Sequence, residues 1–370
     1  MKKEIMTPEM LSKSLTITDL SDPKNGLHAI NIIVEKVRTT LEKAFVTTPI
    51  EVYRTPPLVN VQENFDMLLF PTDNAGRSSR YTRYADTQTV LRTHTSAAIP
   101  GWLKSVRVGL EDKMVLTPGI CYRRDVVDKN HCGEPHQMDV WRIKRGEPRL
   151  ERPALINLIE VLISGVIPGY EYRANEVKHP YTINGLEVEI LVKEEWLEIL
   201  ECGEIHPTIL RNAGINPEEY SGLAMGMGLD RLVMIIKGID DIRTLRSEDP
   251  RISKQMLNID RYTSVSNQPA TKRVLSYSAS ADKNIEDVCE ALREVLGPNT
   301  SCLEKVEVQI IPYTELLEKA RKNLGIKPDQ VNIVTTLTFR SVEKSLPKEV
   351  VNSWMKDIYP KLNEGTTGYM

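Results

Sequence analysis

Hydrophobic residues recur at helical spacing in two long stretches of the first half of the chain. Residues 29–45 predict a helix that packs on one side. Its apolar positions are Ile30, Ile33, Val34, Val37, Leu41 and Phe45. Residues 152–168 are mostly apolar at the same spacing and predict a helix that packs on a sheet. Residues 51–60 form a strand candidate, which Pro56 and Pro57 interrupt.

Residues 221–238 combine a run of small residues with a second helical pattern. Small residues stand at Gly222, Ala224, Gly226 and Gly228. This run predicts a strand that leads into a tight turn, where a flat ligand can approach the backbone without meeting a Cβ atom. From Leu229 the apolar spacing predicts a helix, and Arg231 falls in its first turn. A planar, permanently charged guanidinium there suits a phosphate or a purine face. The alternative is an arginine paired with Asp230 or Asp241 on a solvated face.

Two polar stretches separate these elements. Residues 119–143 predict two strands around a loop rich in charge. Residues 91–97 are polar and compact, which is the composition of a turn with a cap.

The last third of the chain alternates between strand and helix patterns. Residues 257–272 lose periodicity and collect Ser, Asn and Pro, so they predict a linker. The predicted strands are 274–279, 303–311 and 331–340, and the predicted helices are 285–296, 313–324 and 348–362. This spacing predicts a small ferredoxin-like βαββαβ sandwich.

Composition adds limits to this picture. A chain of 370 residues with 41% hydrophobic and 27% charged residues is typical of a globular protein with about two domains. A net charge of −3 argues against non-specific nucleic-acid binding by bulk electrostatics, although local basic patches stay open. The N-terminus has no apolar run typical of a signal peptide, and no stretch is long enough to span a membrane. We therefore expect a cytoplasmic protein without a membrane partner.

The cysteines agree with this location. They are five in number and have no C-x-x-C spacing, which indicates reduced thiols. His131, Cys132 and His136 lack the spacing of a zinc site, so we assign no metal ligands.

The sequence from Gly226 to Arg231 resembles motif 3 of class II aminoacyl-tRNA synthetases. The continuation at residues 240–243 and 253–255, and the upstream run of residues 196–222, are similar to one branch, the α subunit of phenylalanyl-tRNA synthetase. Residues 29–60 resemble motif 1, which forms much of a two-fold dimer interface in that class. Residues 122–125 resemble the arginine and acid of motif 2. The resemblance implies an α+β fold, in which helices flank the antiparallel sheet of class II synthetases.

The resemblance also implies a reaction and a set of site residues. An amino acid and ATP would form an aminoacyl-adenylate and pyrophosphate, with Mg²⁺ present, and the aminoacyl group would pass to tRNA. Arg123 and Arg231 are the expected catalytic residues, because negative charge builds at the α-phosphate and a fixed bidentate cation stabilises it. The ATP-binding residues implied are Arg123, Asp125, His131, Gly228 and Arg231. The amino-acid-binding residues implied are His94, Ser96, Gln137, Asp139, His179, Tyr181 and Ala224.

The chain departs from the family around its substrate pocket. It has His179 and Tyr181 where the family usually has two phenylalanines in Phe-Pro-Phe-Thr. Ile183 stands where bacterial enzymes place a magnesium-binding glutamate, and Pro135 where an aromatic usually stacks on adenine. A buried His or Tyr facing a substrate without a matching polar group would be left unpaired, at a cost of about 1–3 kcal/mol. The alternative function is therefore a paralogous ligase that adenylates a more polar amino acid and transfers it to a non-tRNA acceptor. The structural alternative is that both side chains point away from the site and only pack.

The resemblance suggests four parts: a short N-terminal segment (1–25), a class II catalytic domain (26–258), a linker (259–272) and a ferredoxin-fold anticodon-binding-like domain (273–370). The first part has no room for the long coiled coil of the family's α subunits. We expect a homodimer formed through motif 1 and tRNA contact through the last domain. A helical insert around residues 316–326 is unusual in that domain, which leaves a dimer or partner module as an alternative. A third hypothesis, a non-catalytic regulator, is disfavoured by Arg123, Gln137 and Arg231.

Overall fold

The computed structural model describes residues 4–107, 109–265 and 269–366. The chain divides into two compact units. Unit 1 consists of Met1–Arg123, Glu134–Ile239 and Gln255–Tyr262, and unit 2 of Arg124–Gly133, Asp240–Lys254 and Thr263–Met370. Unit 2 thus takes in two segments that precede the predicted linker in the sequence.

A seven-stranded sheet forms the centre of unit 1. Its strand order is β1-β4-β5-β9-β8-β7-β6; β1 runs parallel to β4, and all other neighbours are antiparallel. The strands are β1 (Ile50–Val52), β4 (Asp112–Ile120), β5 (His136–Arg145), β6 (Tyr172–Glu176), β7 (Thr182–Val192), β8 (Glu195–Ile205) and β9 (Tyr220–Gly228). A separate pair is formed by β2 (Leu58–Asn60) and β3 (Thr89–Leu91). The expected antiparallel sheet is confirmed, apart from the parallel strand at its edge.

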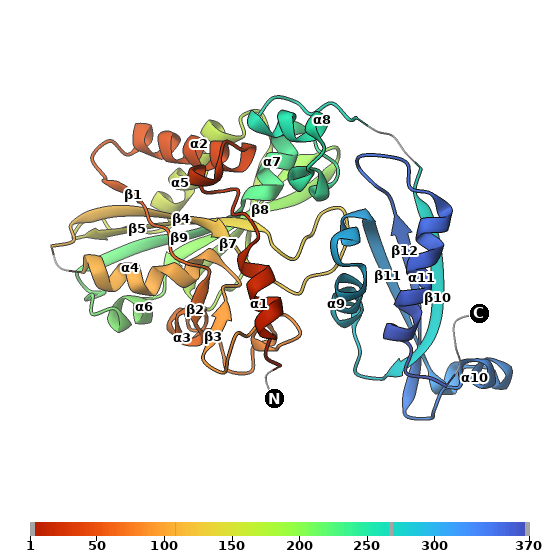
Figure 1. Cartoon of the computed structure of the whole chain (residues 1–370). Helices are drawn as coiled ribbons and strands as arrows, with labels where there is room; N and C mark the ends of the chain where they lie inside the picture. Colours follow the sequence, from red (N-terminus) through yellow and green to blue (C-terminus); the bar gives the residue numbers. More distant parts are fainter. Residues whose placement is uncertain (1–3, 108, 266–268, 367–370) are drawn as a thin grey trace. The chain divides into compact units, whose positions relative to one another are not determined.

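Helices cover both faces of this sheet (Figure 1). On one face lie α2 (Ala29–Ala44), α5 (Arg152–Val166) and α7 (Leu229–Lys237), and on the other α4 (Ile99–Val106) and α6 (Pro207–Asn212). Trp102 of α4 and Ile209 of α6 are buried in one core with Val115 and Trp141 of the sheet. The helices predicted at residues 29–45 and 152–168 are confirmed by α2 and α5.

The junction of β9 and α7 also follows the sequence pattern. The glycine-rich strand ends at Gly228, and α7 begins at the next residue. The helix ends at Gly238, whose φ of 67° lies in the left-handed region that favours glycine. Lys237 in its last turn is only 1% exposed, and its Nζ donates to the carbonyl oxygens of Asn258 and Asp260 at 3.1 and 2.8 Å. These bonds fix residues 258–260 against the end of α7.

The N-terminal part of unit 1 contains a helix that we did not expect. Helix α1 (Pro8–Leu15) begins after Thr7, whose hydroxyl accepts from the backbone N–H of Met10 at 3.2 Å. A threonine cap followed by proline in the first turn is a helix start signal. The short helix α3 (Val61–Asn64) follows β2. The predicted break at Pro56 and Pro57 is confirmed, because they lie between β1 and β2.

Unit 2 contains a three-stranded antiparallel sheet in the order β10-β12-β11. Its strands are β10 (Thr271–Ser280), β11 (Leu303–Pro312) and β12 (Gln330–Phe339), and its helices are α8 (Pro250–Ser253), α9 (Ile285–Leu296), α10 (Glu318–Leu324) and α11 (Lys348–Leu362). Leu292 of α9 and Met355 of α11 are buried in one core with Leu337 of β12. From β10 onward the described residues run βαβαβα, with three strands where a βαββαβ sandwich has four. The ferredoxin-like sandwich is therefore not confirmed.

Within the described residues, no helix combines the length and the apolar character that crossing a membrane requires.

Candidate active site

Two neighbouring strands bring the predicted amino-acid-binding residues to one face of the sheet. In the register of β5 with β9, Gln137 lies opposite Gly228, and Asp139 lies opposite Gly226. A Cβ atom built on Gly226 would meet Asp139 first, at 3.8 Å, and one built on Gly228 would meet Arg231 at 3.9 Å. No described atom comes closer, so the chain leaves room over both glycines, as a flat ligand requires.

Asp139 is a buried carboxylate held by three donors. The hydroxyls of Thr95 and Ser96 donate to it at 2.6 and 2.7 Å, and the indole Nε1 of Trp141 donates at 3.1 Å. The residue is 3% exposed, and burial raises the pKa of its carboxyl group. A carboxylate offers about four lone-pair sites, so it can accept one further donor such as an ammonium group. The structure brings Ser96 and Asp139 together and adds Thr95, which the sequence reasoning missed.

Aromatic rings gather beside Asp139. The ring of Tyr181 stacks with those of Trp141 and His179, at centroid distances of 6.2 and 5.8 Å. Phe70 lies 6.2 Å from Tyr181 and stacks with His94 at 5.3 Å. A set of rings around a few polar groups is the usual lining of a site for an aromatic side chain.

The sequence reasoning also missed Trp141 and Phe70. Trp141 stands two residues after Asp139 on β5, so strand alternation places both side chains on the same face. Phe70 follows a short 3₁₀ helix that ends at Leu68, where no periodic pattern marks its direction. Trp141 could therefore have been found from the sequence, and Phe70 could not.

Of the two ring nitrogens of His179, Nδ1 is hydrogen-bonded, whereas the buried Nε2 makes no hydrogen bond within the described residues and only faces a carboxylate. Its Nδ1 lies 3.1 Å from the hydroxyl of Thr182, and its Nε2 lies 3.4 Å from a carboxylate oxygen of Glu201. The contact with His179 lowers the pKa of Glu201. The His179 side chain is 7% exposed. Thr182 and Glu201 give this ring polar neighbours within the chain, which weakens the expectation that it needs a polar group on the substrate.

His94 is a second buried histidine beside the ring cluster. Both of its ring nitrogens are buried, and neither makes a hydrogen bond within the described part of the chain. Burial, and then the nearby positive charge of Arg123, lower the pKa of the ring from 6.5 to about 3. His94 is therefore neutral, and its ring stacks on Phe70 and meets the edge of Phe65. Its place beside the ring cluster agrees with the predicted role in amino-acid binding, and that role stays a prediction.

The low pKa of His94 predicts an acid-dependent loss of stability. Between its folded pKa of about 3 and its unfolded value near 6.5, the unfolded chain binds the proton and the folded chain does not. The free energy of unfolding should therefore fall as pH falls from about 6.5, by up to about 1.4 kcal/mol per pH unit. Replacing His94 by phenylalanine should make that slope shallower in denaturant unfolding measured between about pH 6 and pH 4. Parallel slopes for the two proteins would contradict the assignment.

The two predicted catalytic arginines lie around one carboxylate. Arg231 donates through Nη1 to the carbonyl oxygen of Glu198 at 2.7 Å and lies 3.9 Å from its carboxylate. Burial and then the charge of Glu201 raise the pKa of Glu198, while Arg231 and Arg123 both act to lower it. Arg123 is anchored through Nε to the carbonyl oxygen of Thr93 at 2.9 Å. The alternative partners for Arg231 are wrong, because Asp230 pairs with His136 and Asp241 pairs with Arg243.

The remaining predicted residues, and the side chain of Gln137, have the following partners in the structure. Ala224 is fully buried in the core with Trp141. The side-chain oxygen of Gln137 accepts from the thiol of Cys121 at 3.4 Å. Asp125 and His131 belong to unit 2, where the Asp125 carbonyl oxygen accepts from Arg293 and His131 Nδ1 lies 2.9 Å from the carboxylate of Asp128. Their roles in ATP binding stay predictions.

The described residues contain no group of three or more His, Cys, Asp or Glu side chains that could hold a metal ion. Mg²⁺ is usually bound by one or two carboxylates together with substrate phosphates. Glu198 is a carboxylate near both arginines and Glu201 is one near Arg123, so the donor chemistry fits an ion that arrives with ATP. Ile183 is apolar and 38% exposed, and contributes no ligand.

Comparison with known proteins identifies the family. Residues 18–256 match the model described as tRNA synthetases class II core domain (F). The α subunit of phenylalanine–tRNA ligase from Acaryochloris marina is 31% identical over 63% of this chain and 68% of that protein. The α subunit from Prochlorococcus marinus is 31% identical over 69% of this chain and 75% of its own length. The chloroplastic/mitochondrial phenylalanine–tRNA ligase of Arabidopsis thaliana is 30% identical over 83% of this chain and 70% of its own length.

A solved pyrrolysyl tRNA synthetase from Desulfitobacterium hafniense has a TM-score of 0.46 and 17% identity over 64% of this chain and 77% of that one, which is too low to support a structural conclusion. The sequence matches and the mostly antiparallel sheet agree with each other. The chain therefore belongs to the class II aminoacyl-tRNA synthetases, is similar to the α subunit of phenylalanine–tRNA ligase, and is a ligase of that class.

Proposed function

We propose that this ligase activates phenylalanine with ATP and transfers it to tRNA. The observation that supports this most strongly is the pairing of a buried carboxylate, Asp139, with a cluster of aromatic rings on the same face of the sheet. The carboxylate suits the ammonium group of an amino acid, and the rings suit an apolar aromatic side chain. The relatives named above are phenylalanine–tRNA ligases.

The reaction needs placement and charge stabilisation rather than a protein nucleophile. The carboxylate of phenylalanine attacks the α-phosphate of ATP, an oxygen–phosphorus bond forms, and pyrophosphate leaves. Arg123 and Arg231 stabilise the negative charge that builds at the phosphate, and their anchors on Thr93 and Glu198 hold them in place beforehand. A hydroxyl of the tRNA end then attacks the carbonyl carbon of the adenylate, and AMP leaves.

Mg²⁺ bound with ATP would neutralise phosphate charge, and Glu198 and Glu201 are the carboxylates with the chemistry to hold it. Glu201 is already paired with His179, which makes Glu198 the better candidate.

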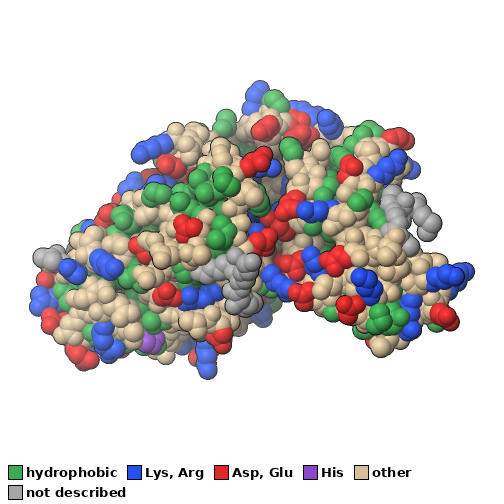
Figure 2. Space-filling model, turned by 60° about the horizontal axis from the view of Figure 1, so that its bottom comes forward, with side chains coloured by type: hydrophobic (Ala, Val, Ile, Leu, Met, Phe, Trp, Pro, Cys, Tyr) green, Lys and Arg blue, Asp and Glu red, His purple; other side chains and the backbone are tan. Residues whose placement is uncertain are grey.

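The partners remain part of this proposal. We propose a homodimer formed through residues 29–60 and tRNA contact through residues 273–370, with the four-part division of the chain given above. On the face drawn in Figure 2, Lys and Arg side chains are mixed with Asp and Glu rather than gathered in one basic field. The net charge of −3 agrees with this, so tRNA binding would depend on local contacts. A cytoplasmic location agrees with five free cysteines.

The acceptor can be tested directly. Incubation with ATP, labelled phenylalanine and total tRNA should place the label on acid-precipitable tRNA, and mild base should release it as free phenylalanine because an ester joins them. Adenylate formation without labelled tRNA would contradict the tRNA part of the proposal and direct the search to another acceptor.

The double substitution His179→Phe with Tyr181→Phe tests the choice of amino acid. We expect phenylalanine to stay the preferred substrate, because the polar partners of His179 are Thr182 and Glu201. The free energy of unfolding should fall by about 1–3 kcal/mol, since Glu201 loses its partner. Pyrophosphate exchange with phenylalanine and tyrosine, together with denaturant unfolding, measures both effects. Tyr181→Phe alone keeps the stacked ring and serves as the control. A change of preference from a polar amino acid to phenylalanine would contradict the proposal.

A further inference from the structure

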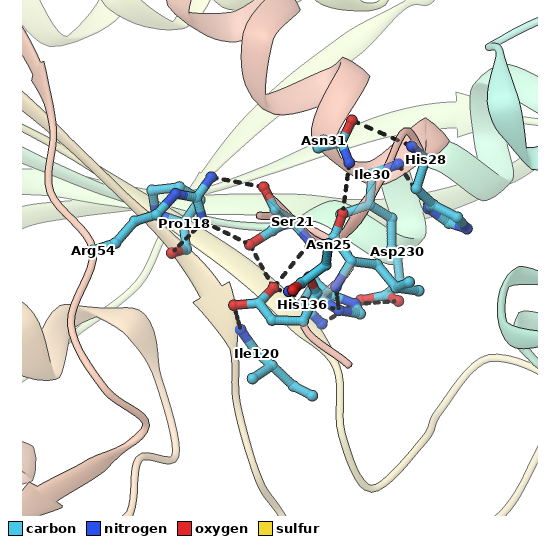
Figure 3. A network of polar contacts seen from close by, with 12 residues as sticks. Ser21, Asn25, His28, Ile30, Asn31, Arg54, Pro118, Ile120, His136 and Asp230 are labelled. Atoms are coloured by element: carbon cyan, nitrogen blue, oxygen red, sulfur yellow. Dashed lines mark hydrogen bonds and ion pairs between the residues drawn. The ribbon is translucent and has the colours of Figure 1, made fainter. Parts of the chain in front are cut away.

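A buried histidine outside the predicted site joins three distant parts of unit 1. His136 is 0% exposed and begins strand β5. Its Nε2 accepts from the backbone N–H of Leu20 at 3.0 Å, and its Nδ1 lies 3.2 Å from the carboxylate of Asp230 (Figure 3). The backbone N–H of His136 donates to the other oxygen of the same carboxylate.

These contacts indicate which ring nitrogen of His136 carries the proton. A backbone N–H can only donate, so Nε2 must present its lone pair to Leu20. The ring proton therefore sits on Nδ1 and is donated to Asp230. His136 thus has one acceptor side and one donor side, and each side has a different hydrogen-bond partner.

The donor side of the ring contacts Asp230, which directly precedes the predicted catalytic residue Arg231. Asp230 is 4% exposed and lies in the first turn of α7, directly before Arg231. Both carboxylate oxygens of Asp230 are held by His136, one by the ring and one by the backbone. In a helix the next residue cannot move independently, because the rise is only about 1.5 Å per residue. The position of Asp230 therefore sets where the Arg231 side chain starts. On strand β5, the predicted amino-acid-binding residue Gln137 follows His136 directly.

The acceptor side of the ring contacts Leu20, which lies in a turn at residues 19–21 that several hydrogen bonds hold in place. The carboxylate of Asp19 accepts from the backbone and hydroxyl of Ser21 at 2.9 and 2.6 Å, and from the backbone of Ile120 at 3.3 Å. Arg54 donates to the carbonyl oxygen of Ser21 at 2.6 Å. The side-chain amide of Asn31 donates to the carbonyl oxygen of Leu20 at 3.2 Å. Figure 3 shows these hydrogen bonds next to His136. The turn therefore presents the Leu20 N–H at a fixed place.

We propose that His136 is a positioning residue, which holds Arg231 through Asp230 at the place that ATP activation requires. The donor arm to Asp230 carries this role, and the acceptor arm to Leu20 holds the ring from its other side. The proposal rests on the proposed function, because its effect is read in adenylation.

Two substitutions separate the two arms. In His136→Asn the amide nitrogen replaces the Nδ1 donor, so the bond to Asp230 is kept and the bond to Leu20 is lost. In His136→Gln the amide oxygen replaces the Nε2 acceptor, so the bond to Leu20 is kept and the side-chain bond to Asp230 is lost, while the backbone bond to Asp230 stays. Each variant loses one buried hydrogen bond, so their losses of stability should be similar.

The measurement is pyrophosphate exchange with separate determination of kcat and of KM for ATP, with thermal unfolding of each protein as the reference. We expect His136→Gln to lower kcat/KM for ATP by about 10²-fold, as a misplaced catalytic group does. His136→Asn should stay within about three-fold of the native protein, because the donor arm is kept. Equal kinetic losses in the two variants, or none in His136→Gln, would overturn the proposal.

Two further measurements keep the test decisive. If His136→Gln does not unfold cooperatively, Asp230→Asn replaces it, since it weakens the same arm from the other side and should give the same kinetic loss. The native protein is assayed first with phenylalanine. A native protein that shows no exchange contradicts the proposed function, whereas an active native protein with equal variants contradicts only the role of His136.

Discussion

Replacing Arg231 by alanine should lower the rate of phenylalanine-dependent pyrophosphate exchange by about 10²–10³-fold, the loss typical of removing a preorganised charge from an adenylation site. Arg231 lies in the first turn of α7, its Nη1 donates to the carbonyl oxygen of Glu198 at 2.7 Å, and its side chain is 35% exposed. It is thus anchored at one nitrogen and accessible at the others, as a side chain that meets a phosphate must be. The loss should appear mainly in kcat, because the charge that it stabilises builds in the transition state.

Arg152→Ala is the matched control. Arg152 is also a half-exposed arginine at the start of a helix of unit 1, and it pairs with Glu176 at 3.4 Å. Exposed ion pairs contribute about 0–1 kcal/mol to stability, so this variant should keep native exchange. Equal activity of the Arg231 and Arg152 variants would contradict the role given to Arg231.

Asp139→Asn should raise the KM for phenylalanine by about 10²-fold, because a buried charged partner of the ammonium group is lost. The KM for ATP should change little. The fold should survive, since the hydroxyls of Thr95 and Ser96 can accept as well as donate and can pair with the new amide. Exchange measured over a range of phenylalanine concentrations, with ATP saturating, gives the KM.

Asp112→Asn controls for loss of a strand carboxylate. Asp112 lies on β4 of the same sheet and pairs with Arg142 at 2.8 Å and with the hydroxyl of Thr48 at 2.9 Å. This change should lower the unfolding temperature and leave the KM for phenylalanine as it is. A similar KM in the Asp139 and Asp112 variants would show that Asp139 does not bind the ammonium group.

The regular elements of this fold could be predicted because local sequence determines them. In α2 and α5 the apolar residues repeat at 3.6-residue spacing, and in β9 and α7 a glycine run gives way to such a repeat. Helix α1 was missed because the hydrophobic pattern of its eight residues is too short, and only Thr7 and Pro8 mark its start.

The number of strands in unit 2 could not be predicted from the sequence pattern. Its alternation of strands and helices was visible in the sequence, whereas the number of strands in the sheet depends on pairing between distant residues. The described residues give β12 two partners, β10 and β11, and no fourth strand. Alternation alone could not decide between three strands and four.

The site divides in the same way. Motif resemblance placed Ser96, Asp139, Arg123 and Arg231 on the list of site residues; the structure brings Ser96 to Asp139 and both arginines near Glu198, and their roles stay predictions. What the sequence could not supply was the pairing of side chains that are far apart along the chain. His179 meets Glu201, and His136 meets both Leu20 and Asp230, and none of these pairs has a local signature. The first of them gives His179 a polar neighbour within the chain and so weakens the expectation of a more polar substrate.

The most direct test of the central claim is ATP–pyrophosphate exchange by the native protein with each of the twenty amino acids, followed by a set of non-standard ones. We expect exchange with phenylalanine to exceed exchange with every other amino acid, and the closest competitor to be tyrosine, which adds one hydroxyl to the same ring. Exchange that responds only to a polar or non-aromatic amino acid, with none for phenylalanine, would contradict the account of the ring cluster around Tyr181 and Trp141.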